Sequence, residues 1–168
     1  MENKKNQAFI LLGSNLGKRE ENLTKAIIAI EKFAIVSLKS SLYKTEPWQM
    51  NDADWFLNQV ILIDTELEAN DLLAVLIKIE AELGRTRGNN IGVYESRTID
   101  LDILYFNDLT LDSELLQIPH PRLHLRKFTL LPLVEIAGDH VHPTLNESNA
   151  QLLAACGDES EVSTLVLL

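Results

Sequence analysis

Residues 97–106 read Arg-Thr-Ile-Asp-Leu-Asp-Ile-Leu-Tyr-Phe and place two acidic side chains in an otherwise apolar run. Acidic and apolar residues alternate before a segment rich in β-branched and aromatic residues, which predicts a β-strand. Successive side chains of a strand point to opposite faces, so Asp100 and Asp102 share one face and the apolar residues beside them share the other. Two neighbouring carboxylates repel each other and resist burial unless a positive charge lies between them.

A divalent cation is one such positive charge. Oxygen ligands without a nearby cysteine are typical of Mg²⁺ or Mn²⁺, the ions that accompany phosphate chemistry. The alternative interpretation is a strand whose solvent-exposed face carries two aspartates. On this tripeptide alone both interpretations stay open.

Cationic residues gather around the aspartate pair. Five of the six arginines fall between residues 85 and 126, namely Arg85, Arg87, Arg97, Arg122 and Arg126. A cationic cluster beside paired aspartates, in an acidic protein, favours a polyphosphate held by arginines and metal ions. The alternative is that these arginines pair with local acidic residues.

The composition predicts one globular domain over residues 1–168, with a polar lead at 1–7 and an acidic and apolar tail at 157–168 of uncertain order. The chain is 46% hydrophobic and 24% charged, which is ordinary for a globular protein. Its net charge of −10 argues against nucleic acid or anionic membranes as partners. A single cysteine, Cys156, excludes an intramolecular disulfide and favours the cytoplasm. No apolar run approaches the ~20 residues of a membrane span, and Met1–Gln7 does not resemble a signal peptide.

Hydrophobic periodicity and turn residues predict the secondary structure. The expected strands are 8–12, 35–43, 56–65 and the one that carries Asp100 and Asp102 within 97–106, the last forming a hairpin with 109–111 through a turn at 107–108. The expected helices are 18–34, one capped by Asn70 or Asp71 that ends before Gly84, 128–136 with a start or kink at Pro132, and 147–155. Residues 165–168 are expected either to pair as an edge strand or to be disordered.

This order of elements is β-α-β-β-α-β, followed by the hairpin and a C-terminal extension. It predicts an α+β fold with a ferredoxin-like core, in which helices pack on a mostly antiparallel sheet. The fold by itself does not indicate an activity.

Five motifs occur in order and with compatible spacing. They are Leu12-Gly13-Ser14-Asn15-Leu16-Gly17, Tyr43-Lys44-Thr45-Glu46-Pro47 with Phe56-Leu57-Asn58, Gly84-Arg85-Thr86-Arg87, the 97–104 stretch, and Pro119-His120-Pro121-Arg122-Leu123-His124-Leu125-Arg126-Lys127-Phe128. With these motifs, residues 8–137 resemble the 6-hydroxymethyl-7,8-dihydropterin pyrophosphokinase family of folate biosynthesis. The resemblance implies transfer of pyrophosphate from ATP to the pterin hydroxymethyl oxygen, with release of AMP.

The resemblance also implies a metal and nucleotide site. Asp100 and Asp102 would hold two Mg²⁺ ions and, with Arg85 and Arg97, form the catalytic set. The implied ATP-binding residues are Glu80, Arg85, Arg87, Arg97, Ile103, His120, Arg122 and Arg126. For His120 the alternative is a turn histidine satisfied by the backbone.

A pterin site is implied in the same way. Its residues would be Gly13, Asn15, Thr45, Glu46, Trp48, Phe56, Asn58, Tyr94 and Phe128. Asn58 would read the edge of the pterin, because an amide offers both a donor and an acceptor. Phe128 and Tyr94 would stack on the two ring faces; for Phe56 and Phe128 the alternative is ordinary core packing. The loops 44–55 and 85–97 would close over the bound substrates.

Two other functions remain in competition. A palm-type nucleotidyltransferase also places paired aspartates on a ferredoxin-like sheet, but it would release pyrophosphate rather than AMP. A ferredoxin-like binding module with a degenerate site is the non-enzyme alternative. The partners expected for the pyrophosphokinase are the small molecules ATP and 6-hydroxymethyl-7,8-dihydropterin, without nucleic acid or membrane, in a monomer or weak homodimer.

Overall fold

A six-stranded antiparallel sheet forms the centre of the computed structural model, which describes residues 5–47, 54–85 and 97–165. Its strands are β1 (Asn6–Ser14), β2 (Ala34–Lys39), β3 (Tyr43–Thr45), β4 (Phe56–Thr65), β5 (Asp100–Phe106) and β8 (Val162–Thr164). A separate two-stranded sheet consists of β6 (Leu111–Asp112) and β7 (Gln117–Ile118). The helices are α1 (Arg19–Ile30), α2 (Ala69–Glu82), α3 (Lys127–Ala137) and α4 (Asn149–Ala155), with a 3₁₀ turn, η1, at Leu123–Leu125.

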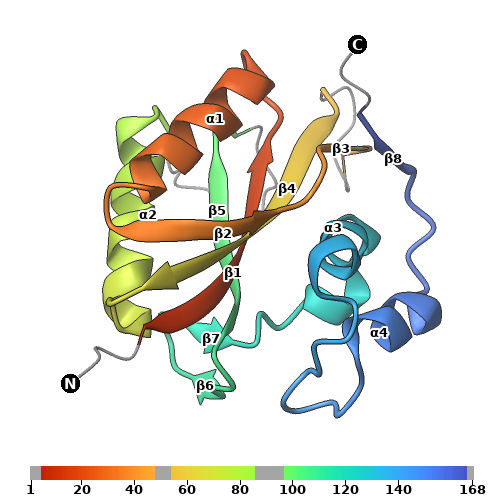
Figure 1. Cartoon of the computed structure of the whole chain (residues 1–168). Coiled ribbons are helices and arrows are strands. Elements are labelled where there is room, and N and C mark those ends of the chain that lie inside the picture. Colours follow the sequence, from red (N-terminus) through yellow and green to blue (C-terminus); the bar gives the residue numbers. More distant parts are fainter. Residues whose placement is uncertain (1–4, 48–53, 86–96, 166–168) are drawn as a thin grey trace.

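The strand order confirms the ferredoxin-like core. β1 lies between β5 and β4, while β2 and β3 both pair with the far edge of β4. Each helical crossover therefore spans one intervening strand: α1 connects β1 to β2 across β4, and α2 connects β4 to β5 across β1. β8 then pairs with β3 and extends the sheet by one strand (Figure 1).

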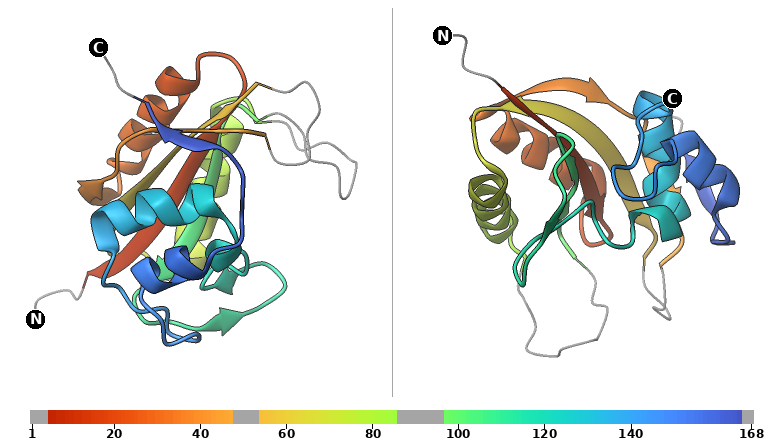
Figure 2. Two further views of the ribbon diagram at one scale, coloured as in Figure 1. Left: turned by 90° about the vertical axis from the view of Figure 1, so that its right-hand side faces the viewer. Right: turned by 90° about the horizontal axis from the view of Figure 1, so that it is seen from below.

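Helices cover both faces of the sheet. Figure 2 shows α1 and α2 on one face and α3 with α4 on the other. Because strand side chains alternate, Ile10 and Leu12 enter the core under α1 and α2, whereas Phe9 and Leu11 enter the core under α3 and α4. Among the helices of the described residues, none is long and apolar enough to cross a membrane.

The segment predicted as one strand at 35–43 is divided. β2 pairs with β4 through an irregularity between Val36 and Leu38, and β3 begins afresh at Tyr43. Between them Ser40 donates its N–H to Val60 O and accepts the Val60 N–H on its hydroxyl, at 2.9 and 3.0 Å. The buried Ser40 side chain thus replaces a regular ladder position and separates the two strands.

The predicted hairpin of residues 97–106 with 109–111 is wrong. Asn107 turns the chain with a φ of +48°, but Leu111–Asp112 then pairs with Gln117–Ile118 and not with β5. Beyond β7 the His120 N–H donates to Leu104 O at 2.9 Å. The outer edge of β5 is therefore contacted by the segment after the small sheet.

Helix ends differ from expectation at three places. α2 begins at Ala69 after Glu68 and has no side-chain cap, so a cap at Asn70 or Asp71 is wrong; Gly84, with a φ of +91°, ends the helix as predicted. α1 ends at Ile30, because residues 34–39 are already in β2. α3 begins at Lys127 and contains Pro132, so it does not begin at the proline. The expected site residues Trp48, Arg87 and Tyr94 lie outside the described residues, as do 48–53 of the expected 44–55 loop and 86–96 of the expected 85–97 loop.

Candidate active site

The strand register aligns the predicted site residues across the sheet. Gly13 of β1 lies opposite Asn58 of β4 on one side and opposite Asp100 of β5 on the other, and Asn58 lies opposite Tyr43 of β3. Directly opposed residues share a face, so Asp100 and Asn58 face the same side across a residue without a side chain. Two strand spacings separate their main chains by about 10 Å.

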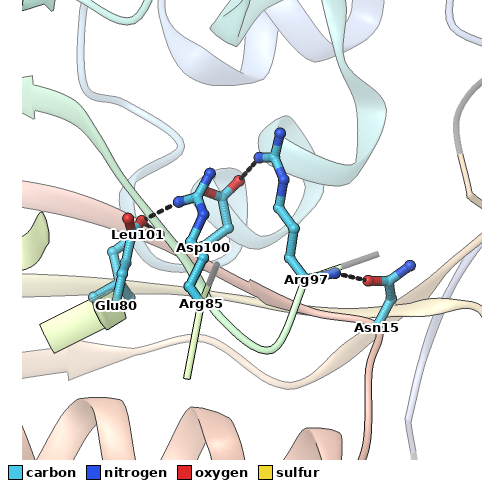
Figure 3. Close-up of polar contacts among 6 residues, drawn as sticks. All are labelled: Asn15, Glu80, Arg85, Arg97, Asp100 and Leu101. Atoms are coloured by element: carbon cyan, nitrogen blue, oxygen red, sulfur yellow. Dashed lines mark hydrogen bonds and ion pairs between the residues drawn. The ribbon is translucent and has the colours of Figure 1, made fainter. Parts of the chain in front are cut away.

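Asp100 is bound by two arginines (Figure 3). Arg85 Nη1 lies 2.8 Å from Asp100 Oδ1, and Arg97 Nη1 lies 2.8 Å from Asp100 Oδ2. Arg85 comes from the segment after α2, and Arg97 precedes β5, so two separate segments converge on one carboxylate. Both carboxylate oxygens are engaged in this arrangement.

Glu80 organises the same cluster from α2. Its side chain is only 4% exposed, lies 2.6 Å from Arg85 Nη1, and accepts the Leu101 N–H at 2.8 Å (Figure 3). Burial raises the pKa of the Glu80 carboxyl, and the Asp100 charge adds to this, while the Leu101 N–H and Arg85 oppose it. The residue thus couples the end of α2 to the start of β5.

Asp102 lies on the same side of β5 as Asp100 and is half-buried. Its pKa is raised, first by burial and then by the charges of Asp100 and Glu80; Arg126 and Arg97 offset only part of this. Carboxylates that raise one another's pKa in this way form a favourable place for a cation. The residues therefore fit a metal ion.

The donor set is that of a hard cation. Among the residues that the structure describes, no group of three or more His, Cys, Asp or Glu side chains is placed to hold a metal. Two carboxylates suit Mg²⁺, which usually keeps several waters and takes phosphate oxygens as its remaining ligands. A bound magnesium would supply charge stabilisation at phosphate oxygens.

Asn58 is buried near the start of β4, close to Phe56. The side chain is 3% exposed, and its Nδ2 donates to the Thr45 hydroxyl at 2.8 Å. A Cβ on Gly13 would lie 2.8 Å from Asn58 Oδ1, so glycine is required for this close approach. Phe56 is half-buried and also borders Gly13, with its ring carbon 3.7 Å from the same Cβ position.

Asn15 positions Arg97. The Arg97 N–H donates to Asn15 Oδ1 at 2.6 Å, and the Asn15 N–H donates to Arg97 O at 3.1 Å (Figure 3). Asn15 is 1% exposed. The turn after β1, which in the sequence resembles a plain strand-to-helix turn, therefore fixes the segment before β5.

The segment after β7 brings further predicted residues to this region. His120 Nδ1 accepts the Arg122 N–H at 3.1 Å; burial, with the charges of Arg126 and Arg122, lowers its pKa to about 4, against the opposing effect of Asp100. Arg126 Cζ lies 5.5 Å from the centre of the Phe128 ring. His120 is thus neutral at pH 7 and contributes a hydrogen-bonding group rather than a charge.

Ile103 differs from the other predicted nucleotide residues. It is 4% exposed and packs in the core under α1 and α2, on the face of β5 opposite to Asp100 and Asp102. Glu46 is exposed, and its Oε1 accepts the Glu161 N–H at 3.0 Å. Arg122 is also exposed.

One contact that fixes this region has no counterpart among the sequence motifs. Glu135 of α3 accepts from the Tyr43 hydroxyl at 2.7 Å and from the Ser41 N–H and hydroxyl, so α3 is attached to the start of β3. The partners are more than 90 residues apart in the chain. No local pattern signals such a pair.

A ferredoxin-like sheet with an arginine-bound Asp100, a second aspartate on the same face and a buried amide fits a transferase that handles phosphate groups. The 7,8-dihydro-6-hydroxymethylpterin-pyrophosphokinase (HPPK) family model matches residues 9–138. The chain belongs to this family.

Individual relatives agree with this assignment. The chain is 44% identical over 133 residues to the 2-amino-4-hydroxy-6-hydroxymethyldihydropteridine pyrophosphokinase of Bacillus subtilis, with 78% of each chain covered. It is 40% identical over 150 residues to the protein of the same name from Methylorubrum extorquens, covering 87% of this chain and 93% of that one. A solved HPPK-DHPS structure from Plasmodium falciparum, with pterin and p-hydroxybenzoate, shares the fold with a TM-score of 0.71 at 18% identity. That match covers 92% of this chain and 42% of the solved one.

Proposed function

We infer that this chain transfers pyrophosphate from ATP to 6-hydroxymethyl-7,8-dihydropterin, giving the pterin diphosphate and AMP in tetrahydrofolate biosynthesis. The family match and two relatives at 40% identity or more support the reaction. The observation that best supports this site is the alignment of Asp100, Gly13 and Asn58 in adjacent strands. It offers a metal and phosphate subsite next to a subsite for a flat heterocycle.

In the nucleotide subsite, Asp100 and Asp102 would hold the two Mg²⁺ ions, which would supply charge stabilisation at the phosphates of ATP. Arg85 and Arg97 leave Asp100 when the nucleotide binds and neutralise the phosphates, assisted by Arg126 and Arg87. Glu80 remains a partner of the Arg85 guanidinium when it leaves Asp100, and it holds the Leu101 main chain. Positioning and charge stabilisation account for most of such a transfer, so no general base is assigned.

In the pterin subsite, Asn58 reads the ring edge with main-chain groups around Thr45. Phe128 stacks on one ring face and Tyr94 on the other, with Phe56 and Trp48 beside them. Exclusion of water by the 44–55 and 85–97 loops protects the phosphate from hydrolysis. We further propose that the protein acts in the cytoplasm as a monomer or weak homodimer.

Product analysis tests the reaction. Purified protein is incubated with ATP, Mg²⁺ and 6-hydroxymethyl-7,8-dihydropterin, and nucleotides are separated by chromatography. AMP formed only in the presence of pterin is expected, with turnover reduced on the order of 10³-fold in Asp100→Ala because charge stabilisation is lost. Asp139→Ala, an exposed carboxylate after α3, is the matched control and should retain wild-type turnover. Free pyrophosphate in place of AMP would support the nucleotidyltransferase instead.

A further inference from the structure

We propose that residues 158–164, the C-terminal strap, are a positioning element for the pterin subsite. The strap contacts two of the elements that carry pterin residues, β3 with Thr45 and the start of α3 with Phe128. It lies beyond the 9–138 segment that the family model matches. The inference rests on the proposed function, because it concerns the pterin subsite of that reaction.

At one end the strap extends the sheet. β8 pairs antiparallel with β3, with Thr45 opposite Val162 and Lys44 opposite Ser163. The Glu46 N–H donates to Glu161 O at 3.1 Å, and the Glu161 N–H donates to Glu46 Oε1 at 3.0 Å. The pairing therefore continues to the last residues before Pro47.

At the other end the strap binds the first turn of α3. Asp158 Oδ2 accepts the Lys127 N–H at 2.9 Å, which satisfies a main-chain donor left unpaired by the helix. Asp158 Oδ1 accepts the Ser160 N–H at 2.9 Å and the Ser160 hydroxyl, so the turn into β8 is fixed by the same carboxylate. Figure 1 shows this segment rising from α4 past α3 to β8.

The position of β3 determines the setting of the Asn58 amide. Thr45 is 1% exposed, and its hydroxyl accepts from Asn58 Nδ2 at 2.8 Å. β3 has only three residues, and without β8 it would be the edge of the sheet, where short strands are weakly held. A shift of β3 would therefore rotate or release the amide that is placed to read the pterin.

The strap complements a second connection between the same elements. Glu135, in the last turns of α3, binds Ser41 and Tyr43 at the start of β3. Asp158 holds the opposite end of α3, next to Phe128. Two attachments at opposite ends fix both the distance and the angle between α3 and β3, whereas one would leave a pivot.

Two variants interrupt the strap at different points. Ser163→Pro removes a main-chain N–H in the middle of β8 and disfavours pairing with β3. Asp158→Ala removes the acceptor at Lys127, and Asp158→Asn restores a side-chain oxygen there. Glu114→Pro is the matched proline control, because Glu114 is the second residue of the 113–116 turn, where proline is favoured.

Steady-state kinetics with each substrate varied in turn measures the effect. Ser163→Pro and Asp158→Ala are expected to raise the KM for the pterin about tenfold, equivalent to ~1.4 kcal/mol. The KM for ATP should stay within about twofold of wild type, since the hydrogen bonds of the strap in the described part of the chain go to β3, Glu46 and Lys127, whereas Arg85 and Arg97 bind Asp100. Asp158→Asn and Glu114→Pro should keep the wild-type pterin KM.

If the strap only stabilises the fold and does not position the pterin residues, the same kinetics give a different result. In that case Ser163→Pro and Asp158→Ala would lower the thermal midpoint but leave the pterin KM of the folded enzyme unchanged, and this would overturn the proposal. An equal rise of both KM values would also overturn it. If Ser163→Pro does not fold, Asp158→Ala with its Asn rescue decides. Failure of the wild-type protein to convert the pterin would refute the proposed function itself. That outcome is distinct from an unchanged pterin KM in the strap variants, which refutes only the role of the strap.

Discussion

Gly13 illustrates how much of this site depends on single residues. It lies between Asn58 and Asp100 in the register, and it leaves the space that the Asn58 side chain occupies. The motif around Gly13 is visible in the sequence. The reason for the glycine is not, because Asn58 is 45 positions further along the chain and the two meet only through strand pairing.

Gly13→Ala is expected to destabilise the protein by about 1–3 kcal/mol, because the new Cβ would overlap Asn58 Oδ1 and no polar partner can move freely in the interior. Chemical denaturation measures the loss, and pterin binding should weaken with it. Gly157→Ala is the control, since nothing lies within 4 Å of its Cβ position. Equal stability of the two variants would contradict this account.

His120 predicts a pH dependence. Its folded pKa of about 4 lies below the unfolded value near 6.5, so the unfolded chain binds more protons between these pH values. The stability associated with neutral His120 is therefore complete above pH 6.5 and is lost as the pH falls towards 4, by about 3 kcal/mol.

His120→Asn tests this dependence, because an amide oxygen near the Nδ1 position still accepts the Arg122 N–H without titrating. Urea unfolding of both proteins at several pH values from 4.5 to about 7.5 is expected to give a shallower decline for the variant. Parallel curves would show that His120 does not titrate differently in the two states.

At the scale of elements, local sequence signals succeeded where an element depends on its own periodicity. β4 occupies residues 56–65 as predicted, and Gly84 ends α2. Local sequence signals failed where contacts with neighbouring elements determine the strand bounds and pairing. The break at Ser40 requires β4 alongside, and residues 111–112 pair with 117–118 because the segment around His120 reaches β5 instead.

Helix α4 provides a test of local capping. Ser148 accepts the Gln151 N–H, and the Gln151 side chain accepts the Ser148 N–H, which forms a complete capping box. Ser148→Ala is expected to cost about 1 kcal/mol in thermal or chemical unfolding. Asn70→Ala, at the wrongly predicted cap of α2, should change stability by less than ~0.5 kcal/mol. A larger loss at Asn70 than at Ser148 would reverse this interpretation.

For the whole molecule, the charge distribution couples ligand binding to the arginine cluster. The protein carries a net charge of −10, yet Arg85 and Arg97 are concentrated on Asp100. Both oxygens of Asp100 are engaged by these arginines, so Mg²⁺ alone must displace both arginines from Asp100 without offering them a new anionic partner. A nucleotide offers the arginines phosphate oxygens in exchange.

Thermal unfolding with and without ligands measures this coupling. Mg²⁺ with a non-hydrolysable ATP analogue, at about 100 times its Kd, is expected to stabilise the protein by ~2.7 kcal/mol, and Mg²⁺ alone by much less. In Asp100→Asn the difference should shrink, because the amide neither holds the arginines nor binds the metal as strongly. A full shift from Mg²⁺ alone would contradict the exchange.

The order of the core elements and the shared face of Asp100 and Asp102 follow from local sequence patterns, and the family follows from five short motifs in order. Tertiary structure decided which residues meet: Gly13 under Asn58, Asn15 against Arg97, Glu80 between Arg85 and Leu101, and the C-terminal strap across β3 and α3. It also placed the Ile103 side chain in the core, away from the aspartates. The physical reason is that pairing and packing between distant segments are selected by the total burial and hydrogen bonding of the fold, which no local pattern encodes.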